Sequence, residues 1–160
     1  MAKGQKTNSG LITLFASLLL VGGAVTWIFV KGPRDADPSA KVLAKEGVHW
    51  HADLSITIKG EKQAIPADVG TGGAAAHPEN LHTHDDSGTI HAEFPGVVRA
   101  NELKIGKFFE IWGKTFDANC IFDKCTGAEG TLKFLVNGQP NTDYGEYSTR
   151  DGDKLEIVFE

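Results

Sequence analysis

Residues 49–58 read HWHADLSITI and alternate strictly between polar and apolar side chains. Successive side chains of a β-strand point to opposite faces of a sheet, so this alternation predicts a half-buried strand. One face of the predicted strand is apolar and suited to a core. The other face is polar and begins with His49, His51 and Asp53.

Residues 82–91 read HTHDDSGTIH and predict a β-hairpin that turns at Asp86 and Ser87. This turn makes His82 face His91, and His84 shares the face of His82 because it lies two residues further along the strand. Opposed residues have Cβ atoms only about 4.5–5.5 Å apart. Three imidazoles at that spacing can hold one metal ion about 2.0–2.1 Å from each nitrogen. The sequence therefore predicts a metal site with His82, His84 and His91 at its centre.

The pair His49 and His51 completes or neighbours this site if the first strand lies beside the hairpin. Asp85 or Asp53 then adds an oxygen ligand or orients an imidazole. His77, in a loop of small residues before a proline, is predicted to lie outside the site. Imidazole ligands favour copper or zinc, and the only methionine is Met1, which argues against a methionine-rich copper(I) carrier.

Other interpretations of the histidines remain open at this stage. A hydrogen-bonded polar cluster without metal is one, and a pH sensor is another, because imidazoles change charge near neutrality. A metal-dependent enzyme with an open coordination position is a third. No carboxylate can be assigned as a general base, so the pattern leaves open whether the protein is an enzyme. A structural or interaction module that needs no metal is the last alternative.

The remaining patterns predict an α+β domain in which one helix packs on a small mixed or antiparallel sheet. The apolar spacing over residues 103–112 is partly helical, and Gly113 is a natural helix end. Further strands are expected at residues 63–69, 81–84, 89–94, 131–136 and 155–159, with Pro66 confining the first of these to a sheet edge.

Residues 11–30 contain no charged side chain and are long enough to cross the hydrocarbon core of a membrane as one helix. We expect an uncleaved anchor, because the run is longer than the apolar part of a signal peptide and ends in bulky residues. Residues 1–10 are then a short cytoplasmic N-terminus and residues 31–46 a linker. Residues 47–160 form an extracytoplasmic domain at the cell membrane.

The part that follows the predicted anchor is acidic. Residues 31–160 carry 14 Lys and Arg against 21 Asp and Glu, a formal charge of −7. Nucleic-acid binding needs clustered positive charge, so this composition argues against it. The predicted partners are a metal ion and the membrane, and no protein partner can be assigned from the sequence.

Cys120 and Cys125 are the only cysteines. A zinc ribbon needs a second cysteine pair, and a redox motif usually has two intervening residues rather than four. We therefore expect a local structural disulfide, which suits an oxidising compartment outside the cytoplasm.

Several motifs together resemble a family of short single-pass microbial proteins, most of them uncharacterised. The motifs are HWHADL, LHTHDDSGTIH, FFEIWGKTF, CIFDKC and LVNG, followed by DGDKLEIVFE, and they span about residues 48–160. The resemblance implies a membrane-anchored outer domain and no particular activity. The ending TLKFLVNGQP with DGDKLEIVFE also resembles, more weakly, the closing strands of β-grasp domains, which implies a β-grasp-like sheet with one helix.

Overall fold

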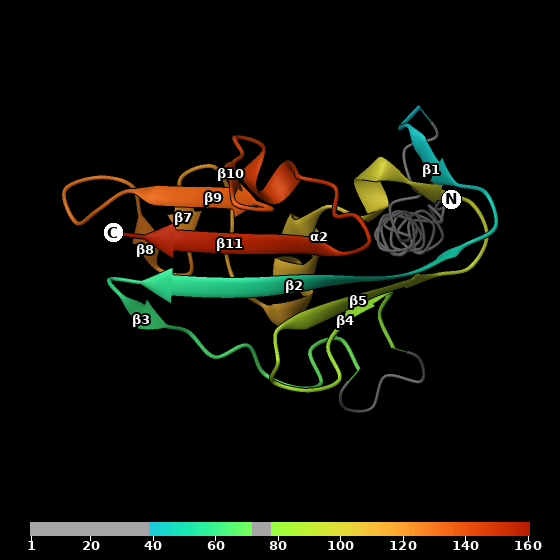
Figure 1. Ribbon diagram of the computed structural model, residues 1–160, viewed down its shortest axis with the longest axis horizontal. Helices are drawn as coiled ribbons and strands as arrows, with labels where there is room; N and C mark the ends of the chain where they lie inside the picture. The colour runs from blue at the N-terminus through green and yellow to red at the C-terminus, as the bar shows by residue number, and fades with distance from the viewer. Residues whose placement is uncertain (1–38, 72–77) are drawn as a thin grey trace, which may run out of the picture. The chain divides into compact units, whose positions relative to one another are not determined.

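Strand β2 (Val48–Ile58) lies at the centre of a seven-stranded mixed sheet in the computed structural model, which describes residues 39–71 and 78–160. β11 (Asp153–Phe159) runs parallel to β2 on one side, and β5 (Thr89–Phe94) runs antiparallel to it on the other (Figure 1). The outer strands are β9 (Leu132–Val136) and β10 (Gln139–Pro140) beyond β11, β4 (Leu81–His82) beyond β5, and the short β3 (Glu61–Lys62), which pairs with β2.

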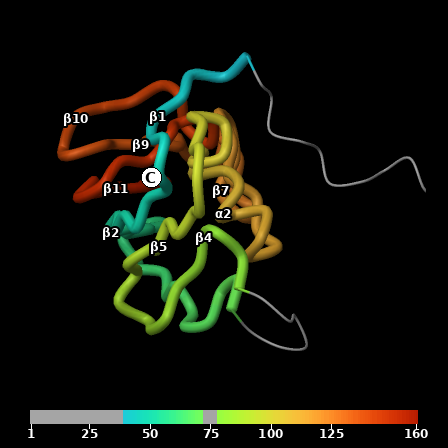
Figure 2. The backbone as a smooth tube through the Cα atoms, turned by 90° about the vertical axis from the view of Figure 1, so that its right-hand side faces the viewer, coloured from blue at the N-terminus to red at the C-terminus, as the bar shows by residue number. Residues whose placement is uncertain are grey.

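Helix α2 (Ile105–Trp112) is the one α-helix of the described residues, and it covers a single face of the sheet. Figure 2 shows α2 on one side of β2 and β11. The helix buries Phe108 and Phe109, and the core includes alternate residues of the central strands such as Leu54 and Ile157. The helix ends at Gly113, which adopts the left-handed conformation at φ 71°. The alternation in β2 therefore assigns its apolar set to the core and its polar set to the opposite face.

Smaller elements complete the domain. β1 (Val42–Ala44) pairs with β6 (Val98–Arg99), and β7 (Cys120–Ile121) pairs with β8 (Lys124–Cys125). Two short 3-10 helices, η1 (Ala100–Glu102) and η2 (Tyr144–Glu146), follow β6 and precede β11. Cys120 and Cys125 form the expected disulfide across the β7–β8 hairpin, so that prediction is confirmed.

The strand predicted at residues 63–69 is wrong. The return strand is β3, and the chain then leaves the sheet and turns at residues 67–70. Gln63 still donates its backbone N–H to the Ile56 carbonyl of β2. Further along, Val69 donates its backbone N–H to the Thr83 hydroxyl, and that hydroxyl donates to the Pro66 carbonyl. A side-chain partner satisfies the backbone as well as a sheet ladder does, and proline has no N–H to give to a ladder.

Several predictions concern residues outside the described ranges. They are the cytoplasmic segment 1–10, the span 11–30, the linker up to residue 38, and His77. The chain divides into a unit of residues 1–35 and a unit of residues 36–160. β1 falls within the last part of the predicted linker, where it pairs with β6. Within residues 39–71 and 78–160, no helix has the length and apolar character needed to cross a membrane.

Candidate metal centre

Three neighbouring strands bring the histidines together on the face of the sheet opposite α2. His51 of β2 pairs with His91 of β5, and His91 pairs in turn with His82 of β4. These three imidazoles therefore stand in one row across the sheet. The predicted facing of His82 and His91 is confirmed, and it follows from a hairpin whose tight turn ends at Gly88.

A second row lies beside the first and contains a residue that the sequence analysis missed. His49 of β2 pairs with Glu93 of β5. Glu93 follows His91 by two residues, and residues two apart on a strand share a face. The alternation of β5 therefore placed Glu93 on the histidine face, but its pairing with His49 could be known only once β2 and β5 were known to be neighbours.

The ligand atoms gather into two groups, in each of which they lie within 4.8 Å of one another. The β2 group consists of His49, His51 and His91, and the β4 group consists of His82, His84 and Glu93. His91 belongs to the β2 group and Glu93 to the β4 group, but the His91 ring also lies beside that of His84, at 4.4 Å between centroids. The predicted trio of His82, His84 and His91 is therefore close together. Either group could hold a metal ion.

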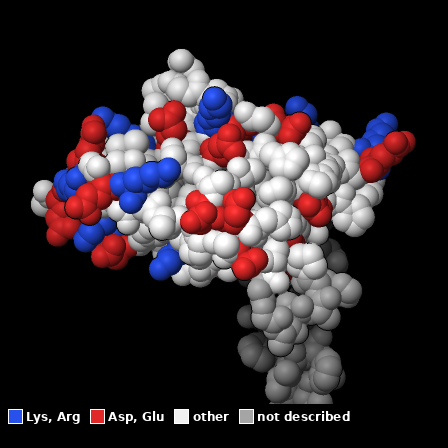
Figure 3. Space-filling model, turned by 60° about the horizontal axis from the view of Figure 1, so that its bottom comes forward, with Lys and Arg blue, Asp and Glu red and all other residues white. Residues whose placement is uncertain are grey.

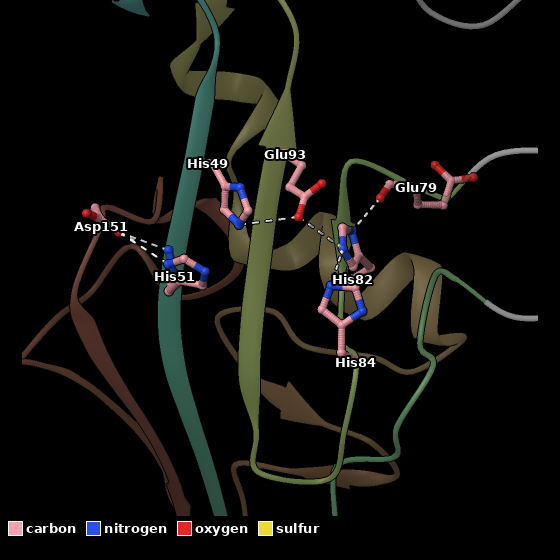
Figure 4. A network of polar contacts seen from close by, with 7 residues as sticks. All are labelled: His49, His51, Glu79, His82, His84, Glu93 and Asp151. Carbon is pink, nitrogen blue, oxygen red and sulfur yellow. Dashed lines mark hydrogen bonds and ion pairs between the residues drawn. The ribbon is translucent and has the colours of Figure 1, made fainter.

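His82 is the most buried member, with 2% of its side chain exposed. Its Nδ1 lies 2.8 Å from the Glu79 carbonyl oxygen. A carbonyl only accepts hydrogen bonds, so Nδ1 of the neutral ring carries the proton, and Nε2 has a lone pair that can accept a hydrogen bond or bind a metal. That Nε2 lies 3.3 Å from Nε2 of His84 and 3.8 Å from Oε1 of Glu93 (Figure 4). A backbone contact of this kind orients histidines that bind metals.

Glu93 lies between the two groups. Its Oε1 is 3.8 Å from Nε2 of His82 and 3.4 Å from Nε2 of His49. Figure 4 shows the carboxylate reaching from β5 between the imidazoles of its two neighbouring strands. One carboxylate oxygen therefore approaches a histidine of each group.

His91 occupies the middle of the cluster, with its ring centroid 4.4 Å from that of His84 and 4.7 Å from that of His51. Burial lowers the pKa of His91, and the neighbouring imidazoles lower it further, while Glu93 opposes the shift. The neutral imidazole, which is the form that binds metals, is therefore favoured. Its Nδ1 is buried and has no hydrogen-bond partner among the described residues.

The turn before β11 holds His51 in place. The His51 backbone N–H donates to Oδ1 of Asp151 at 2.9 Å, and its carbonyl accepts from the Gly152 N–H at 2.8 Å. The same Asp151 oxygen lies 4.0 Å from Nδ1 of His51. The backbone of this histidine is thus bonded on both sides by a segment that is distant in the sequence.

The two aspartates predicted to assist the site have other partners. Oδ1 of Asp53 accepts a hydrogen bond from the Thr89 hydroxyl at 3.0 Å. Oδ1 of Asp85 accepts from the Ser87 backbone N–H at 2.9 Å, and hydrogen bonds from Ser87 are the main reason that the pKa of Asp85 is lowered. Glu93 and Asp151 have carboxylate oxygens within 4.0 Å of an imidazole nitrogen, and Asp85 interacts electrostatically with His91 and His84.

The surface charge is unevenly distributed. On the face shown in Figure 3, basic and acidic side chains are mixed at one end, and the middle carries mainly acidic side chains. The whole chain has a formal net charge of −5. An excess of negative charge attracts cations toward a surface and raises their local concentration.

Comparison with known protein families, curated proteins and solved structures finds no match to this chain. The class of protein is therefore defined by the fold and the site themselves. It is an α+β domain whose sheet carries, on the face away from its helix, two groups of side chains that could hold metal ions.

Proposed function

We propose that this protein is a membrane-anchored, extracytoplasmic metal-binding protein that binds copper or zinc through its histidine face. The separation of 3.3 Å between Nε2 of His82 and Nε2 of His84 carries the proposal. Two nitrogens bound tetrahedrally to one ion at about 2.0–2.1 Å are about 3.3 Å apart, whereas a right-angled arrangement at the same bond length separates them by about 2.9 Å. The two rings form a hydrogen bond without metal, and their nitrogens also have the spacing of two ligands of a tetrahedral ion.

The hydrogen-bond partners of the imidazole nitrogens also favour metal binding over a purely hydrogen-bonded network. The contact with Glu79 leaves the lone pair of His82 Nε2 directed at the other ligands. A network without metal would pair its buried nitrogens, yet Nδ1 of His91 has no partner among the described residues. Metal coordination satisfies such atoms with an ion.

The location is proposed from the sequence and the disulfide. Residues 11–30 have the length and apolarity of a membrane span. The disulfide between Cys120 and Cys125 suits an oxidising compartment. Both features favour a domain held outside the cytoplasm, where it would bind, buffer or pass on the ion.

Metal analysis of the full chain, purified without a polyhistidine tag, tests the proposal. We expect copper or zinc to remain bound after desalting, or to bind tightly when Cu(II) or Zn(II) is added to the chelator-treated protein. Mg(II) is the matched control ion, because it prefers oxygen ligands and should not bind. A protein that holds no metal and shows no measurable affinity for Cu(II) or Zn(II) would contradict the proposal.

A further inference from the structure

The two groups are close enough to share one side chain. Oε1 of Glu93 lies near one histidine of each group. Both distances are near the separation expected for two ligands of one tetrahedral ion, about 3.3 Å. The distance is 3.4 Å to His49 in the β2 group and 3.8 Å to His82 in the β4 group. The same oxygen is thus placed to serve an ion in either group.

The number of donors exceeds what one ion uses. A tetrahedral site takes four ligands, whereas this face offers five imidazoles and one carboxylate. The donors also come from three strands, and neighbouring strands are about 4.7–4.9 Å apart, so β2 and β4 are separated by two such spacings. Two sets of three ligand atoms are found on this face, each within 4.8 Å of one another.

We propose that this face holds two metal ions at once, one in the β2 group and one in the β4 group, with Glu93 as the carboxylate between them. This inference rests on the proposed function, since it concerns the number of ions and not whether metal binds. Paired sites in other proteins hold ions about 3.5–4 Å apart. A shared carboxylate offsets part of the repulsion between two cations at such a distance.

The two sites differ in their access to solvent. In the β4 group, His82 is 2% exposed and the Glu79 carbonyl orients its ring. In the β2 group, His49 and His51 have 61% and 47% of their side chains exposed. We expect the ion of the β4 group to exchange slowly and the ion of the β2 group to exchange readily, because water and competing ligands reach the second group more easily.

The number of ions is measured by titrating Zn(II) into the full-length, untagged, chelator-treated chain in detergent. The wild-type chain should bind two ions. His84→Ala and His49→Ala each change an exposed residue of one group, so neither should disturb folding. Each variant should bind one ion with near wild-type affinity. Its affinity for the other ion should fall at least about tenfold, because loss of an outer-shell partner alone costs about tenfold and loss of a direct ligand costs no less.

The outcomes separate the inference from the proposed function. One ion in the wild-type chain, lost in both variants, would mean a single shared site and overturn the inference while metal binding stands. No bound ion at all would defeat both. Circular dichroism of each variant establishes that it is folded, so a loss of binding is attributable to the ligand.

The role of Glu93 is tested separately with Cu(II) as a spectroscopic probe. Two adjacent Cu(II) ions in the wild-type chain should give the electron paramagnetic resonance of a coupled pair. Glu93→Gln should weaken that coupling or remove one ion, whereas Glu156→Gln should change neither. Glu156 is a matched control because it is an exposed carboxylate on the same face of the sheet, opposite Ser55. Coupling that is unchanged in Glu93→Gln would exclude Glu93 as the shared ligand.

Discussion

At the scale of single residues, the chemistry of this face depends on which atoms are left without protein partners. His82 donates a hydrogen bond from Nδ1–H to the Glu79 carbonyl, and its Nε2 lies toward His84 and Glu93. His91 keeps a buried nitrogen without a partner among the described residues. Buried polar atoms are rarely left unpaired, and this nitrogen belongs to a side chain of a group that could hold a metal ion.

The side chain of Tyr147 leads to a prediction about how the stability of the fold depends on pH. Burial, together with a hydrogen bond from the Tyr147 hydroxyl to Asp153, raises the pKa of Tyr147 to about 12. An unfolded tyrosine loses its proton near pH about 10. The contribution of Tyr147 to stability is therefore complete below pH about 10 and is lost as the pH rises through about 12.

The pKa of Tyr147 is measured by following the absorbance of tyrosinate as the protein is titrated to alkaline pH. The chain has two tyrosines, so Tyr147→Phe should remove the late step while Tyr144→Phe keeps it. A folded protein in which both tyrosines ionise together near pH 10 would contradict the prediction.

At the scale of elements, the β4–β5 hairpin sets the geometry of the site. Gly88 ends its turn with φ +90°, and its carbonyl accepts a hydrogen bond from the Leu54 N–H of β2 at 2.9 Å. A Cβ on Gly88 would lie 2.5 Å from the Leu54 carbonyl oxygen. This glycine therefore allows the close approach that holds the hairpin against β2.

Gly88→Ala should lower the free energy of unfolding by at least about 1–3 kcal/mol, the usual cost of a strained backbone conformation. It should also weaken metal binding, because displacement of the turn alters the register of β5 against β2. Gly96→Ala is the control, since Gly96 also has positive φ but its Cβ would meet nothing within 4 Å. Denaturant unfolding and Zn(II) titration compare the two, and equal effects in both variants would show that the contact with Leu54 is unimportant.

A separate prediction concerns the disulfide of the β7–β8 hairpin. The disulfide closes a loop with a sequence separation of only 5 residues. Replacing both cysteines, as Cys120→Ser with Cys125→Ser, should cost about 2 kcal/mol on the chain-entropy account. The number of bound metal ions should stay the same, because the ligand groups contain only imidazole and carboxylate donors. Loss of metal in this double variant, measured by elemental analysis of folded protein, would implicate the sulfur atoms.

At the scale of the whole molecule, the site joins strands that are far apart in the chain. β2 contributes residues 49 and 51, and β4 and β5 contribute residues 82–93. The β2 group takes its ligands from both parts. An ion bound there stabilises the folded state, because the unfolded chain does not hold these residues together.

Zn(II) should therefore raise the free energy of unfolding by about 2.7 kcal/mol when its free concentration is about 100 times Kd, and a chelator should reverse the gain. Thermal unfolding with and without Zn(II) measures the effect. Glu156→Gln should show the full gain and His84→Ala a smaller one. A thermal midpoint that does not move with Zn(II) would argue against ions bound by the native state.

Local patterns in the sequence determined much of this protein. Alternation defined both faces of β2, the short turn made His82 face His91, and the spacing of the cysteines indicated their disulfide. Each depends on residues close together in the chain, whose geometry follows from the two-residue repeat of a strand and the reach of a turn. The membrane span, the identity of the metal and the family resemblances stay predictions.

Only the tertiary structure decided which strands are neighbours and in what register. The antiparallel pairing of β2 with β5 sets His51 opposite His91 and His49 opposite Glu93, and so brings the histidines of β2 to those of the β4–β5 hairpin. The tertiary structure also replaced the strand expected at residues 63–69, where the Thr83 hydroxyl bonds to the Val69 N–H and the Pro66 carbonyl. Pairing between distant strands depends on how the whole core packs against α2, and a slip of one residue would move every histidine of β2 to the buried face.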